Sequence, residues 1–169
     1  MGKARSLMCE EPKKKLTALS EMETLMEEKL RQGGTVKFSP KGVSMLPMLR
    51  SRGDSVTLEK PPARLKKGTV ALFISRNGEE KKYILHRLVG KKGDLYVFCG
   101  DNKSECDPPV GYEDIIGAVT EYESRGKSRS LKEPWYRLYS FWMVATRRIR
   151  PFSRRVQALV YRIWKKLFR

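Results

Sequence analysis

Short apolar runs separated by turn residues dominate the middle of the chain. Between residues 35 and 122 these runs have the length of strands, and clusters of Gly, Pro, Asn or Asp divide them. The expected strands are Thr35–Ser39, Ser55–Glu59, Thr69–Ser75, Lys82–Val89, Leu95–Cys99 and Ile115–Tyr122. Asn77-Gly78 lies between two of them and predicts a tight hairpin, because both residues tolerate positive φ. The pattern predicts a mainly β domain over residues 35–122.

Helical periodicity flanks this region on both sides. Upstream, apolar residues recur at helical spacing over 13–32 until Gly33-Gly34 ends the run, so residues 1–34 are expected to form a tail and a helix. Downstream, the polar and basic residues 123–132 predict a linker. Residues 133–169 predict two amphipathic basic helices separated by Pro151. Their apolar faces carry Trp135, Leu138, Trp142, Ala145 and Ile149 in the first helix, and Val156, Leu159, Val160, Ile163 and Leu167 in the second.

The charge of the chain is strongly positive and bears on its partners. Lys and Arg total 36 against 19 acidic residues, a formal net charge of +17, which favours an anionic partner. Apolar stripes backed by basic residues predict that residues 133–169 attach to an anionic membrane surface, and packing of the stripes on the β domain is the alternative. Nucleic acid ranks behind both, because the sequence shows no DNA-binding module.

Other compositional features bear on compartment and cofactors. No run approaches the roughly 18 apolar residues of a membrane-spanning helix, so we expect a cytoplasmic protein with peripheral membrane contact. Cys9, Cys99 and Cys106 are too loosely spaced for a disulfide framework or a zinc site. Reduced thiols are therefore expected, with a Cys99–Cys106 pair as the less favoured alternative. No metal or other cofactor is expected.

Three polar segments carry candidate chemistry. Ser44 lies between Gly42 and Pro47, in a segment suited to a tight turn at a strand end, and His86 is the single histidine of the chain, within a β-like run. Asp101 and Asp107 surround a Gly/Asn-rich turn. Each segment alone is typical of ordinary turn or strand chemistry. Together they supply a nucleophile, a base and a carboxylate to orient that base.

The order of these segments resembles the signal peptidase family, and more broadly the clan that also holds the self-cleaving LexA-type repressors. The resemblance extends from about Val36 to Ala118. Its motifs are Ser44-Met45-x-Pro47, His86-Arg87-x-Val89, and Gly100-Asp101-Asn102 followed by Asp107, with further similarity at Arg52-Gly53-Asp54 and over residues 65–70. It implies the coiled β-sheet domain of the signal peptidase and LexA fold.

The same resemblance implies a serine endopeptidase that removes signal or leader segments from precursors after small residues. Histidine at position 86 is similar to the archaeal and endoplasmic-reticulum type, whereas bacterial housekeeping enzymes have lysine there. Ser44 is then the nucleophile and His86 the general base. Asp107 or Asp101 orients the imidazole, with Asp107 favoured. Gly42 stands where the family often has a serine that assists the oxyanion, which leaves backbone N–H groups as donors.

Two other functions stay open at this stage. One is a LexA-like regulator that cuts itself, although that branch typically has lysine in place of His86 and no DNA-binding domain is expected before residue 35. The other is a non-catalytic peptide-binding module held at a membrane surface. The oligomeric state cannot be derived from the sequence.

Overall fold

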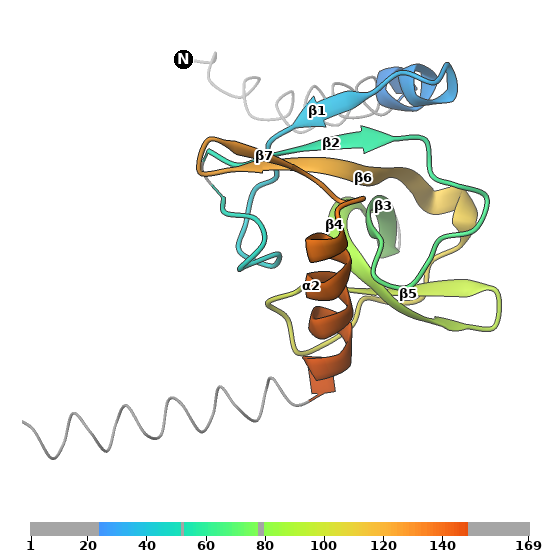
Figure 1. The fold of residues 1–169 in the computed structure, drawn as a ribbon. Coiled ribbons are helices and arrows are strands. Elements are labelled where there is room, and N and C mark those ends of the chain that lie inside the picture. The colour runs from blue at the N-terminus through green and yellow to red at the C-terminus, as the bar shows by residue number, and fades with distance from the viewer. Residues whose placement is uncertain (1–23, 52, 78–79, 149–169) are drawn as a thin grey trace, which may run out of the picture.

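The computed structural model describes residues 24–51, 53–77 and 80–148 (Figure 1). The protein is mainly β, as predicted, with a seven-stranded antiparallel sheet and helices before and after it. The strands are β1 (Val36–Phe38), β2 (Ser55–Glu59), β3 (Val70–Asn77), β4 (Glu80–Lys92), β5 (Leu95–Cys99), β6 (Ile115–Ser124) and β7 (Lys127–Ser130). The helical elements are residues 24–31, the 3₁₀ turns η1 (Tyr112–Asp114) and η2 (Thr146–Arg148), and α2 (Pro134–Ala145).

The strand order is β1-β2-β6-β3-β4-β5, and β7 pairs with β6 beyond the end of β3. The long strands β3 and β4 form the hairpin predicted from Asn77-Gly78, with Asn77 opposite Glu80. This hairpin sets His86 opposite Ala71 and Arg87 opposite Val70. Strand β5 then returns along β4 and brings Cys99 opposite Arg87, so that the loop following β5 begins next to the histidine.

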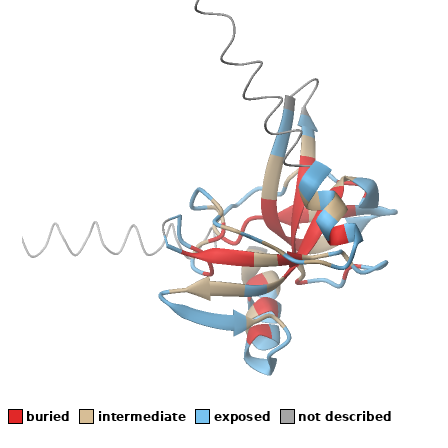
Figure 2. Cartoon of the chain, turned by 90° about the horizontal axis from the view of Figure 1, so that it is seen from above, coloured by how far each residue is buried: buried red, intermediate tan, exposed pale blue. Residues whose placement is uncertain are grey.

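Two apolar cores lie on opposite faces of the central strand β3. Because successive side chains of a strand point to opposite faces, Val70, Leu72 and Ile74 enter one core while Ala71 and Phe73 enter the other. Figure 2 shows the buried residues concentrated along the strands. The second core includes Phe73 and Phe98, whose rings stack at a centroid distance of 4.5 Å, and it supports the strand that carries His86.

The prediction of a linker over residues 123–132 is wrong. Strand β6 continues to Ser124, Arg125 and Gly126 form a turn with φ of 55° and 71°, and β7 pairs back onto β6. The segment is polar because β7 is almost entirely exposed, and its strand conformation comes from ladder hydrogen bonds to β6. Such pairing leaves little trace in local hydrophobicity.

The helix α2 begins close to the predicted position, but it presents an unexpected face to the sheet. Tyr136, Ser140 and Met143 are buried against the domain, whereas the predicted stripe of Trp135, Leu138 and Trp142 is exposed. The stripe therefore does not cover the β domain. Among the described residues, no helix is long and apolar enough to cross a membrane. The helix predicted over 13–32 is present over residues 24–31. Residues 13–23 of that prediction, Cys9 and the second basic helix lie outside the described residues.

Candidate active site

Ser44 lies in a turn-rich loop between β1 and β2 and is half-buried. Backbone bonds from Leu46 N to Val43 O and from Leu49 N to Met45 O close successive turns around it. The far end of the loop is held by the buried Asp54, whose carboxylate accepts hydrogen bonds from Arg50 N (2.7 Å) and Ser124 Oγ (2.8 Å). The Gly53-Asp54 pair of the sequence motif thus ties the serine loop to β6.

His86 projects from the middle of β4 and is 2% exposed. Its Nδ1 atom lies 2.5 Å from Oδ2 of Asp107. An ionised carboxylate only accepts hydrogen bonds, so this contact favours the proton on Nδ1, and in the neutral imidazole Nε2 is then the acceptor. Asp107 is placed by its own backbone, since its N–H donates to Phe98 O (2.9 Å) at the end of β5.

The loop after β5 brings the serine and the histidine together. Asn102 N donates to Ser44 O at 2.7 Å, and the side-chain amide of Asn102 donates to Val43 O at 3.0 Å. Gly100 is wedged between the two groups: a Cβ at this position would lie 2.7 Å from Ser44 O and 2.9 Å from Nε2 of His86. Only glycine permits this close approach.

Ser44 and His86 both line a cavity of about 290 Å³. Its other walls combine apolar side chains with polar groups, and the exposed basic residues at its edge are Lys41, Arg50 and Lys103. Its apolar lining comes from Phe38, Met45, Leu49, Leu72, Ile84 and Leu85, with Tyr83 beside them. Among the described residues, no hydrogen bond joins the Ser44 hydroxyl to the imidazole.

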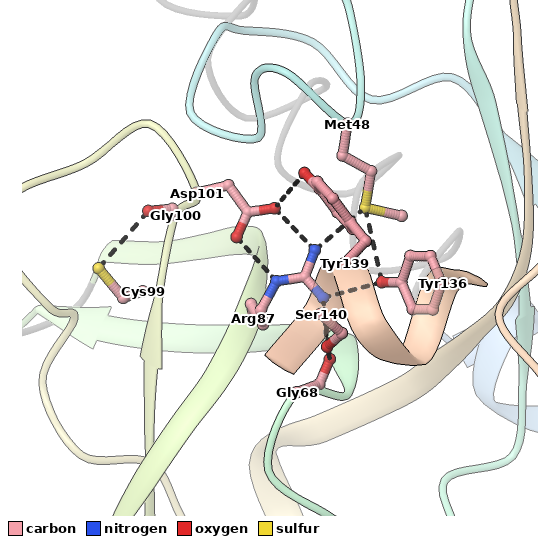
Figure 3. A network of polar contacts seen from close by, with 9 residues as sticks. All are labelled: Met48, Gly68, Arg87, Cys99, Gly100, Asp101, Tyr136, Tyr139 and Ser140. Carbon is pink, nitrogen blue, oxygen red and sulfur yellow. Dashed lines mark hydrogen bonds and ion pairs between the residues drawn. The ribbon is translucent and has the colours of Figure 1, made fainter. Parts of the chain in front are cut away.

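Asp101 has a different partner from the one considered for it in the sequence. Its carboxylate accepts two hydrogen bonds from the guanidinium of Arg87, from Nε at 2.8 Å and from Nη2 at 2.7 Å (Figure 3). Both side chains are almost fully buried. The structure therefore separates the two aspartates: Asp107 faces His86, and Asp101 faces Arg87.

The remaining donors of Arg87 bind the helix α2 and the turn that precedes β3. Nη1 donates to Gly68 O (3.0 Å), to Tyr136 Oη (2.9 Å) and to Ser140 Oγ (2.9 Å). Burial is the largest single influence and lowers the pKa of Arg87. The hydrogen bonds and charge interactions with Asp101 and Tyr136 together outweigh burial and raise the pKa above its usual value. The arginine is thus a permanent cation that joins the loop after β5 to α2.

The tyrosines of α2 complete the shell around this ion pair. Tyr136 and Tyr139 lie with their rings 5.6 Å and 5.4 Å from the guanidinium carbon of Arg87. Burial raises the pKa of both phenols above their ordinary value. Both tyrosines therefore remain neutral near pH 7. Sequence reasoning missed these roles, because the two tyrosines lie far from Arg87 along the chain.

Two thiols lie beside this loop. Cys99 is buried and Cys106 exposed, and both are free. Cys99 Sγ donates to Glu105 O at 3.1 Å, while burial, with the neighbouring Cys99 as a second cause, raises the pKa of Cys106. Within the part of the chain that the structure describes, no three His, Cys, Asp or Glu side chains gather as a metal site.

Comparison of the chain with protein-family models, with curated proteins and with solved structures gives no match.

The first prediction concerns the buried ion pair. Arg87→Met leaves the carboxylate of Asp101 buried without its cation, so we expect a loss of about 3–5 kcal/mol in the free energy of unfolding, measured by urea denaturation. Lys37→Met removes the exposed pair with Glu123 and should leave the midpoint almost unchanged. An equal change in the free energy of unfolding for the two substitutions would contradict a stabilising role of the Arg87–Asp101 pair.

The second prediction concerns the close approach at Gly100. Gly100→Ala should lower the free energy of unfolding by about 1–3 kcal/mol through overpacking. It should also shift the imidazole resonances of His86, which NMR can assign directly because the chain has one histidine. Gly90→Ala is the matched control, since a Cβ there meets nothing within 4 Å. Unmoved imidazole resonances in Gly100→Ala would show that the loop does not touch the ring.

Proposed function

We propose that the protein is a serine endopeptidase of the signal-peptidase type, with Ser44 as nucleophile and His86 as general base. One observation carries the proposal. A buried imidazole is held by a carboxylate through Nδ1, and it stands in the wall of a cavity that Ser44 also lines. Serine hydrolysis requires an imidazole oriented by a carboxylate and a serine close to it, and these observations support that arrangement.

The reaction follows from the roles of these groups. Nε2 of His86 takes the proton of the Ser44 hydroxyl as Oγ bonds to the scissile carbonyl carbon. The imidazolium that forms is stabilised by Asp107. The imidazolium then protonates the leaving amine as the C–N bond breaks, and an acyl-enzyme remains. Water, deprotonated by the same nitrogen, hydrolyses the ester and regenerates Ser44. Backbone N–H groups of the serine loop, including that of Ser44, are the donors proposed for the oxyanion.

The character of the cavity supports a peptide substrate with small or apolar residues at the scissile bond. Its volume of about 290 Å³ accommodates a few short side chains, and its lining combines apolar side chains with the three basic residues at its edge. A cleft of this character fits the hydrophobic signal or leader segment of a precursor, which is the substrate class that the sequence resemblance implies.

We also propose that the β domain has the coiled-sheet fold of the signal peptidase and LexA clan. The motifs that resemble the signal peptidase and LexA clan lie on different strands and loops, yet they converge in this structure: Ser44 follows β1, His86 is on β4, and Asp107 follows β5. Two of these motifs also have structural tasks, since Asp54 holds the serine loop and Asp101 holds Arg87. Such convergence favours a functional origin of the motifs over chance.

The third prediction tests catalysis directly. Purified protein incubated with a library of leader-type peptides should yield defined cleavage products by mass spectrometry. Ser44→Ala and His86→Ala should each lower the rate by at least about 10³-fold, because nucleophile and base act as a unit. A serine-directed phosphonate should label wild-type protein and not Ser44→Ala. Cleavage that persists unchanged in either variant would remove the proposal.

The fourth prediction separates the two aspartates. Asp107→Asn should lower kcat by about 10³–10⁴-fold with little change in KM, because an amide favours the wrong imidazole tautomer. Asp94→Asn, at an exposed turn between β4 and β5, should have no effect. If Asp101→Asn lowered kcat far more than Asp107→Asn at equal stability, Asp107 would not be the orienting residue.

A further inference from the structure

The outer face of α2 is apolar and exposed. Trp135 is 75% exposed and Phe141 69% exposed, and Leu138 and Trp142 are exposed beside them. These four side chains lie on the side of the helix opposite the buried Tyr136, Ser140 and Met143. The helix is held from behind by the Arg87 network, so it presents this face as part of a fixed surface.

Basic residues border the apolar face on both flanks of α2. A groove of about 740 Å³ runs along one flank, and its basic residues are Lys66, Lys67, Arg137 and Arg147. A groove of about 620 Å³ runs along the other flank, with Arg50, Arg125, Lys127 and Arg129 as its basic residues and Glu133 as its acidic one. Two large apolar tryptophans with a rim of cations form the pattern of an interfacial helix.

The charge along the chain agrees with this pattern. From residue 134 to residue 169 the sequence holds ten Lys or Arg and no Asp or Glu. A second copy of the chain would meet this surface with the same positive charge, which opposes association. A nucleic acid would pair with the cations but would leave Leu138 without an apolar environment. An anionic bilayer satisfies both, because its headgroups pair with cations and its acyl boundary accepts Trp, Phe and Leu.

We propose that α2 docks on an anionic phospholipid bilayer, with Trp135, Leu138, Phe141 and Trp142 inserted below the headgroups. The two basic grooves then receive phosphate groups of the lipid. Arg50 lines both the second groove and the candidate active-site cavity, so the docked surface borders that cavity. The docking itself does not depend on peptidase activity and is tested without a peptide.

The experiment uses the full chain and vesicle flotation. The vesicles contain phosphatidylcholine with 40% phosphatidylglycerol, or phosphatidylcholine alone. Wild-type protein should float with the anionic vesicles and at least tenfold less with the neutral ones. The variant with Trp135→Ala, Phe141→Ala and Trp142→Ala should lose at least tenfold in partitioning. The matched control combines Leu25→Ala and Leu95→Ala, which also remove exposed apolar groups, and should bind as wild type.

A second measurement locates the inserted residues. In the Trp164→Phe variant the tryptophans that remain are Trp135 and Trp142, both on α2. Vesicles with brominated acyl chains should quench their fluorescence strongly. Vesicle binding without quenching would overturn the proposal, because binding would then involve another part of the chain.

The behaviour of the triple variant and of Ser44→Ala provides further tests of the docking proposal. The triple variant should keep the urea midpoint of wild type, since the substituted side chains are exposed. A triple variant that floats as wild type does would overturn the proposal. So would a triple variant that keeps vesicle binding but loses binding to a single-stranded oligonucleotide, because the surface would then be a nucleic-acid site. Ser44→Ala should float as wild type, so a failed peptidase assay and a failed docking assay remain distinguishable.

Discussion

The buried ion pair between Arg87 and Asp101 is the interaction on which the arrangement of the candidate site and of α2 depends. A cation removed from water is tolerated only when it is paired and hydrogen-bonded. Here the carboxylate of Asp101 takes two of its donors and α2 takes others, together with the carbonyl of Gly68. Since each of these partners comes from a different segment, the arginine determines how the segments are placed relative to β4.

The arrangement of the site follows from two neighbouring residues of one strand. Successive side chains of β4 point to opposite faces, so His86 approaches Phe73 of the second core while Arg87 meets Met48 and Tyr136 at the first. A single loop after β5 serves both: its first aspartate binds Arg87 and its second binds His86. Fixing the loop through the ion pair therefore also fixes the carboxylate behind the imidazole.

The same ion pair links the cavity to the molecular surface. It holds the inner side of α2, which leaves the aromatic side of the helix directed outward. Both sides of α2 carry large apolar or aromatic side chains, and polar groups decide which side faces the sheet. Tyr136 and Ser140 can hydrogen-bond Arg87, whereas Trp135, Leu138 and Phe141 offer no acceptor. The orientation of the helix, and with it the surface proposed for docking, is a consequence of satisfying one buried cation.

The sequence by itself determined six of the seven strands, the β3–β4 hairpin and the residue types of the candidate site, because alternation and turn residues are local signals. It also offered two aspartates, Asp101 and Asp107, as candidate partners of His86 and favoured Asp107. Only the tertiary structure assigned Asp107 to His86 and Asp101 to Arg87, made residues 127–130 a strand, and turned Tyr136 inward. These features depend on hydrogen bonds between segments distant along the chain, and a local pattern does not record which distant group will satisfy a buried charge.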